Sequence, residues 1–253
     1  MVMGKRFVIL LATWLTLVPA QVTAPMPVRQ TELLALVAGN ALPENVVQQI
    51  LTNGLAFRPD PAYRAFLMNA GANPMVLKAL DSAKVSLAQG EESAGDNANT
   101  DVLQRLSDAA RLMHAKRYDE AARNLTAAVT VSFKSPECGF VMGELLQQRE
   151  DWERAEVMYE AVLNQEPDFP EVHTKLSYIL YRLGDADAAL REAKVALAIT
   201  PDNAEAHKNA GLALSEMRKF DAAAEEYKQA LRLKPDYKPV RYGLAHLGRE
   251  QSD

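Results

Sequence analysis

Residues 170–203, PEVHTKLSYILYRLGDADAALREAKVALAITPDN, and residues 204–237, AEAHKNAGLALSEMRKFDAAAEEYKQALRLKPDY, carry one pattern at a spacing of 34 residues. Small residues recur at this spacing, as Ala121, Ala155, Ala189 and Ala223 and as Ala109, Gly143, Ser177 and Gly211. Large apolar residues and prolines recur with them, as Leu112, Leu146, Leu180 and Leu214 and as Pro167, Pro201 and Pro235. Because small side chains let two helices cross closely and large ones fill the space between helices, the pattern predicts repeated helix pairs.

This unit resembles the tetratricopeptide repeat (TPR), and the resemblance covers residues 102–250. It places four units and a closing helix at 102–135, 136–169, 170–203, 204–237 and 239–249. The first unit departs most from the pattern, with Asp108 at an apolar position and Phe133 where proline ends the other units. The resemblance implies an all-α fold, an α-solenoid of TPR helix-turn-helix repeats in which each unit is buried by its neighbours.

Residues 28–89 predict a small N-terminal helical module. Asp60-Pro61 and Asn73-Pro74 each open an apolar segment, and Asp or Asn before Pro is a helix-start signal because the side chain caps free backbone N–H groups. Apolar residues repeat weakly at an offset of 30, so that Leu36 falls on Phe66. We therefore expect two helical hairpins that bury their apolar faces on one another as a hairpin bundle. Small polar residues at 90–101 predict a flexible linker between this module and the solenoid.

The first 20 residues predict a signal peptide. Lys5 and Arg6 precede fourteen uncharged residues, and Val18 and Ala20 suit cleavage after Ala20. The run is shorter than the ~20 apolar residues that cross a bilayer. We expect an exported chain, periplasmic or secreted; the alternative is an uncleaved N-terminal helix that anchors it. The resemblance as a whole is to an exported bacterial TPR protein.

Composition excludes several function classes. The 28 Lys and Arg residues against 33 Asp and Glu, without a basic block, give no electrostatic footprint for nucleic acid. A single cysteine, Cys138, permits no intramolecular disulfide and supplies too few ligands for a structural zinc site. We therefore expect no nucleic-acid partner and no metal.

Catalytic signatures are also absent from the sequence. There is no G-x-S-x-G motif, no phosphate-binding glycine loop and no H-E-x-x-H motif. His173 and His207 are 34 residues apart, but equivalent positions of stacked units are poorly placed to share one ion, so packing is the favoured interpretation. Cys138 is interpreted as a small buried side chain. The sequence therefore predicts no enzyme, no cofactor and no small-molecule substrate.

The resemblance implies a binding surface, because the first helix of each TPR unit lines a concave groove that receives a peptide or partner helix. Carried over position by position, the predicted groove residues are Phe140, Glu144, Gln147, Gln148, Tyr178, Tyr181, Arg182, Lys208, Glu216 and Tyr242. Of the residue set with which some family members grip a C-terminal carboxylate, only Lys208 and Asn209 match, so that clamp is incomplete. Tyr and Arg carry binding energy at many interfaces.

We therefore expect a protein–protein interaction scaffold or adaptor of the bacterial cell envelope that binds a peptide or protein in the concave TPR groove. Two alternatives stay open at this point. One is a structural oligomer that self-associates through the solenoid edge or the N-terminal hairpins, and the other is an accessory subunit of an envelope complex.

Overall fold

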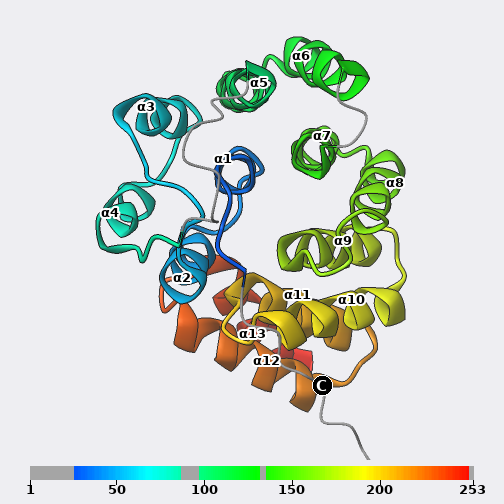
Figure 1. Cartoon of the computed structure of the whole chain (residues 1–253). Coiled ribbons are helices and arrows are strands. Elements are labelled where there is room, and N and C mark those ends of the chain that lie inside the picture. Colours follow the sequence, from blue (N-terminus) through cyan, green and yellow to red (C-terminus); the bar gives the residue numbers. More distant parts are fainter. Residues whose placement is uncertain (1–25, 87–96, 132–134, 251–253) are drawn as a thin grey trace, which may run out of the picture.

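A computed structural model describes residues 26–86, 97–131 and 135–250 of the chain. These residues form thirteen helices: α1 (Gln30–Ala38), α2 (Pro43–Asn53), α3 (Pro61–Asn69), α4 (Pro74–Ser82), α5 (Asn97–His114), α6 (Tyr118–Val131), α7 (Pro136–Gln148), α8 (Trp152–Leu163), α9 (Pro170–Arg182), α10 (Ala186–Ile199), α11 (Ala204–Glu216), α12 (Phe220–Leu233) and α13 (Lys238–Glu250). Helices α5 to α12 are the four predicted pairs, α13 closes the array, and the pairs follow a curved path (Figure 1). The all-α solenoid is confirmed.

Close helix crossings inside the units depend on glycine facing tyrosine. A Cβ atom added to Gly143 of α7 would lie 2.4 Å from the Tyr159 ring of α8. The same relation recurs in the fourth unit, where a Cβ on Gly211 would lie 2.4 Å from the Tyr227 ring. The small residues of the 34-residue pattern therefore make room for a buried aromatic ring on the second helix.

The turn between the two helices of each unit contains a left-handed residue. Lys116, Glu150 and Arg218 have φ near +60°, and Gly184 occupies the equivalent position in the third unit with φ +89°. This conformation costs an L-residue about 1–2 kcal/mol because Cβ approaches the following carbonyl oxygen, whereas glycine adopts it freely. Three of the four units therefore carry backbone strain at one turn.

Exchange of residues at this turn should change stability in opposite directions. We expect Glu150→Gly to stabilise the fold by about 1 kcal/mol and Gly184→Ala to destabilise it by about the same amount. Urea unfolding followed by circular dichroism measures both. Glu153→Gly, inside the first turn of α8, is the matched control and should destabilise, because glycine lowers helix propensity; stabilisation by that variant as well would refute the turn argument.

All four predicted helices of the N-terminal module are present as α1 to α4. Asp60 and Asn73 accept hydrogen bonds from the free amides of Tyr63 and Met75, as the helix-start signals predict. The loops between helices meet at Leu55, whose N–H donates to the Lys84 carbonyl at 2.8 Å and whose carbonyl accepts from Ser86 N–H at 2.8 Å.

The structure corrects the expected independence of this module. Helix α1 lies inside the curve of the solenoid and packs against α5 and α7 (Figure 1), so the apolar core is continuous from Val28 to Ile179. Leu33, Leu34 and Leu36 of α1 are fully buried. A small hairpin bundle cannot bury such a helix alone, and the concave face of the repeats supplies the missing cover.

The predicted linker is also too long at its C-terminal end. Helix α5 begins at Asn97, inside the range 90–101, and its early turns are supported by an ion pair between Arg105 and Asp101 at 2.7 Å. Opposite charges four residues apart stabilise a helix. A linker prediction based on composition does not take such pairs into account. The predicted signal peptide at 1–20 lies outside the described residues.

Candidate functional site

The concave face of the repeats is partly filled by the chain's own N-terminal helices. Phe140 and Glu144, predicted to line an open groove, are both buried. The Phe140 ring lies 6.1 Å from that of Tyr159 and 5.3 Å from that of Phe169, and Gly39 at the end of α1 abuts its edge. Phe140 therefore holds the α1–α2 turn in place and is not available to a partner.

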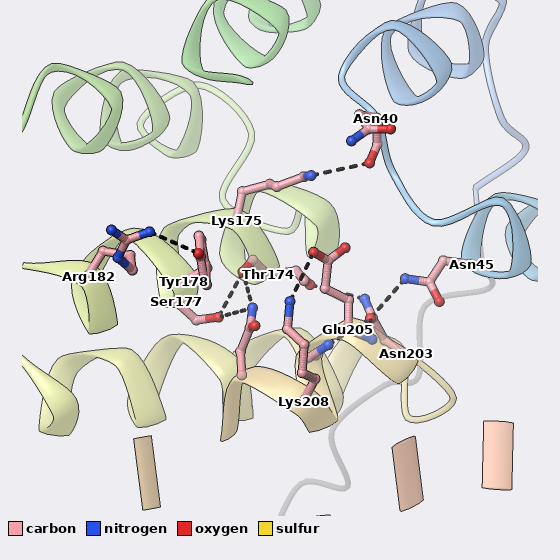
Figure 2. A network of polar contacts seen from close by, with 12 residues as sticks. Asn40, Asn45, Thr174, Lys175, Ser177, Tyr178, Arg182, Asn203, Glu205 and Lys208 are labelled. Atoms are coloured by element: carbon pink, nitrogen blue, oxygen red, sulfur yellow. Dashed lines mark hydrogen bonds and ion pairs between the residues drawn. The ribbon is translucent and has the colours of Figure 1, made fainter. Parts of the chain in front are cut away.

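Polar side chains join the N-terminal helices to the groove at several points. Thr31 donates to Glu137 at 2.8 Å, and Asn45 of α2 donates to the side chain of Asn203 at 2.8 Å. Figure 2 shows Asn45 reaching toward Asn203, and Lys175 of α9 reaching toward the Asn40 carbonyl at 3.3 Å. These bonds fix the position of the N-terminal module in the groove.

A buried charge network lies on the floor of the groove, the surface that the N-terminal helices cover. Lys175 Nζ is 3.1 Å from the Glu144 carboxylate, and both side chains are almost fully buried. Burial works to lower the pKa of Lys175, but Glu144 and Glu205 outweigh it and raise that pKa to about 12. Burial likewise works to raise the pKa of Glu205, but Lys175 and Lys208 bring it below its usual value. Lys175 and Glu205 are therefore both charged near neutral pH.

Beyond the module, part of the groove stays open and carries five side chains that we call the aromatic–cation strip: Trp152, Tyr178, Tyr181, Arg182 and Lys208. The Arg182 guanidinium lies 4.2 Å from the centre of the Trp152 ring and donates to the Tyr178 hydroxyl at 3.1 Å. Lys208 Nζ lies 5.1 Å from the centre of the Tyr178 ring. Tyr178 is thus in contact with two cations, and Arg182 remains exposed with no carboxylate ion pair among the described residues.

Tetratricopeptide repeat profiles match residues 112–179, 146–213 and 204–237. The chain belongs to the tetratricopeptide repeat family. No curated relative matches the sequence.

Solved TPR structures share the fold. MamA, residues 41 to the end, from Desulfovibrio magneticus RS-1 has a TM-score of 0.55 at 22% identity, covering 64% of this chain and 89% of that one. PilF of Pseudomonas aeruginosa has a TM-score of 0.57 at 17% identity over 62% and 72% of the two chains. PilW, a widely conserved type IV pilus biogenesis factor, gives 0.55 at 22% identity over 61% and 70%. At these identities the likeness concerns the fold alone.

The remaining predicted TPR groove residues are scattered. Asn209 is buried between units, where it donates to the Thr174 carbonyl at 2.8 Å, so it is closed to a partner. Gln148 is half-buried and donates to Glu144 at 3.0 Å. Tyr242 on α13 is 75% exposed. Of the predicted set, the structure brings together Tyr178, Tyr181, Arg182 and Lys208.

Two groups escaped the sequence prediction. Trp152 opens the second helix of its unit, outside the first-helix positions that the resemblance assigns to a TPR groove. Glu137, Glu171 and Glu205 stand 34 residues apart along the groove floor, and that spacing alone could have identified them. Burial raises the pKa of Glu171 to about 7, even though Gln49 donates a hydrogen bond to its carboxylate.

His173 and His207 each connect two neighbouring TPR units through hydrogen bonds. Nδ1 of His173 lies 2.7 Å from Glu192 and Nε2 lies 2.7 Å from the Pro167 carbonyl, and His207 repeats this with Glu226 and Pro201 at 2.7 and 3.0 Å. Burial opposes the charged form of His173, but these acceptors outweigh it and raise its pKa. Both rings are therefore occupied in packing, in line with the sequence interpretation.

Cys138 is buried, and burial raises the pKa of its thiol, in keeping with a packing role. No group of three or more potential metal ligands gathers among the described residues. None of the helices described is long and apolar enough to span a bilayer.

Proposed function

We propose that this TPR chain is a protein-interaction scaffold that holds a peptide or protein segment on the aromatic–cation strip. The observation that carries the proposal is the position of Arg182, stacked on Trp152 and bonded to Tyr178, at the open end of a groove whose other end the chain fills itself. Tyr and Trp offer rigid apolar area with a polar end, and Arg182 is already held by two contacts, so the strip itself loses little side-chain freedom when a partner binds.

The arrangement favours a partner segment that brings an apolar side chain next to a carboxylate. The Arg182 guanidinium has one face on Trp152 and directs one N–H at Tyr178, so its remaining donors suit a carboxylate. Tyr178 and Tyr181, with ring centres 6.4 Å apart, provide neighbouring apolar area.

Substitution in the strip should abolish partner capture without loss of fold. We expect Tyr178→Ala with Arg182→Ala to reduce recovery of partners in affinity purification by about tenfold or more, because two clustered interface side chains are lost. Unchanged helicity by circular dichroism shows that the variant folds. Lys228→Glu, on an exposed face of α12, is the matched control and should retain capture; equal capture by the strip variant would refute the proposal.

We also propose that the scaffold works outside the cytoplasm, in the cell envelope. The support is the sequence of residues 1–20, with its two cations, uncharged run and small residue before the cleavage point. Mass spectrometry of the protein recovered from a periplasmic fraction should give a chain starting at Gln21. A cytoplasmic chain that retains Met1 would count against export.

A further inference from the structure

Helices α1 and α2 are held in the groove in different ways. Helix α1 is seated by fully buried leucines against α5 and α7. Helix α2 packs its backbone against α4, and it reaches the solenoid chiefly through long polar side chains: Asn45 to Asn203, Gln49 to Glu171, and Glu44 to Lys234. Val46 and Ile50 of α2 are buried in the same core as the α1 leucines, but the close backbone neighbours of α2 are α4 and α1. Because polar contacts contribute less net stability than apolar burial, α2 is held on the solenoid itself more weakly than α1.

The polar contacts of α2 are also incompletely satisfied. Glu44 and Glu171 each accept one of these bonds at one carboxylate oxygen, and the other oxygen is buried without a hydrogen-bond partner. Asn45 donates through its amide nitrogen, and its side-chain oxygen is likewise buried without a partner. Such an oxygen has lost its water without gaining a donor, which costs free energy. This cost is recovered when α2 lifts and water or another donor reaches the oxygens.

The floor beneath α2 carries charges of both signs. Glu144, Glu171 and Glu205 lie on it together with Lys175, Lys208 and Lys234, and Glu171 takes its hydrogen bond from Gln49 of α2. Four groups surround the Glu171 carboxylate. They are Gln49 of α2, Glu32 of α1, Glu205 of α11 and, on its own helix α9, Lys175. Helix α2 offers this floor the Glu44 carboxylate, which accepts from Lys234, and two amide donors, Asn45 to Asn203 and Gln49 to Glu171.

We infer that α2 is a movable cover over this charged floor, and that the floor accepts a partner segment that offers an amide donor to Glu171 when the cover lifts. This inference rests on the proposed scaffold function and extends it from the strip to the covered part of the groove. The chain's own α2 is then a built-in competitor that a partner must displace.

Opening should depend on pH, because burial opposes the ionised form of Glu171. A carboxyl whose pKa is raised in the closed state, to about 7, favours closure at low pH, and this contribution is lost as pH rises through that value. The neutral variant Glu171→Gln keeps an acceptor for Gln49 and removes the charge. It should therefore hold the cover closed at high pH.

Hydrogen exchange on the full chain tests the cover. After correction for the intrinsic pH dependence of exchange, we expect α2 amides to exchange faster than those of α1, α9 and α11, and faster at pH 8 than at pH 5. Glu171→Gln should slow α2 exchange at pH 8 by about tenfold or more, whereas Glu160→Gln, at an exposed position of α8, should leave it unchanged. Protection of α2 equal to that of α9, or no effect of Glu171→Gln, overturns the inference.

A peptide in trans tests what the floor accepts. A fluorescent peptide of residues 40–56 should bind a full chain carrying Asn45→Ala and Gln49→Ala about tenfold more tightly than the unsubstituted chain, whose own α2 occupies the floor. The same peptide with Gln49→Glu should lose this binding, because a carboxylate would replace the amide that donates to Glu171. Equal binding to both chains, no binding to either, or indifference to Gln49→Glu overturns the inference.

The two proposals can fail separately. Tyr178→Ala with Arg182→Ala should leave both α2 exchange and peptide binding unchanged, since these two side chains lie outside the covered floor and Lys208, which belongs to both the strip and the floor, is left in place. If that variant loses partner capture while α2 exchange in the unsubstituted chain shows no opening, the scaffold proposal stands and the cover proposal fails.

Discussion

Ala223→Glu should destabilise the solenoid by about 3–5 kcal/mol, the range expected for an uncompensated buried charge. Ala223 is fully buried in the crossing between α11 and α12, in the same core cluster as Tyr227 and Leu214. A glutamate there must either bury its carboxylate or separate the two helices. Because each repeat is stabilised by its neighbours, the loss should spread to α13 and weaken the whole C-terminal end.

Urea unfolding measures this effect, with Ala222→Glu as the matched control. Ala222 is the adjacent residue of α12 and is exposed, so the same substitution should change the free energy of unfolding by less than about 0.5 kcal/mol. An Ala223→Glu chain as stable as the Ala222→Glu chain would contradict the assigned helix crossing.

Gly39→Leu should destabilise the fold by about 3 kcal/mol and separate the α1–α2 turn from the solenoid. A Cβ atom added to Gly39 would lie 2.2 Å from the Phe140 ring. That ring is fully buried between Tyr159 and Phe169, so it has no room to withdraw. The larger side chain therefore forces the N-terminal helices away from α7.

The matched control is Gly248→Leu, because a Cβ atom on Gly248 of α13 would have no atom within 4 Å. We expect that variant to unfold like the unsubstituted chain in a thermal melt. If Gly39→Leu also melted like the unsubstituted chain, the turn could not be seated against Phe140.

The repeat architecture could be predicted because its information is local and periodic. Ala223, Gly211 and Pro235 each recur at one fixed spacing, and helix pairs follow from residue size at those positions. The helix starts of the N-terminal module were equally local, since Asp60 and Asn73 cap helices within three residues of themselves.

The placement of the N-terminal module could not be predicted in the same way. Its contacts join residues far apart in the chain, as with Asn45 and Asn203, which are separated by 158 positions. A weak repeat at an offset of 30 suggested that the hairpins pack on each other, but Leu33, Leu34 and Leu36 give α1 more apolar surface than its partners can cover. A helix that is apolar on all sides is typical of a buried position, and this is the signal that the hairpin interpretation passed over.

This placement decides which TPR groove residues can bind a partner. Phe140, Glu144 and Asn209 have groove positions but serve the chain's own packing. Tyr178 and Arg182 lie past the module and keep their polar groups at the surface. A position in the repeat indicates which way a side chain points, but what already covers it depends on the rest of the chain.

The N-terminal helices should occupy the concave face of the repeats in solution, and a nuclear Overhauser effect between Gly39 and Phe140 is the sharpest test of this placement. The contact between Gly143 and Tyr159, inside one repeat, has a similar spacing and serves as an internal reference. We predict that a chain labelled at glycine and aromatic residues shows both effects, from the Gly39 α protons to the Phe140 ring and from Gly143 to Tyr159. The Gly143–Tyr159 effect without the Gly39–Phe140 effect would show a folded solenoid with an empty groove and would contradict the claim.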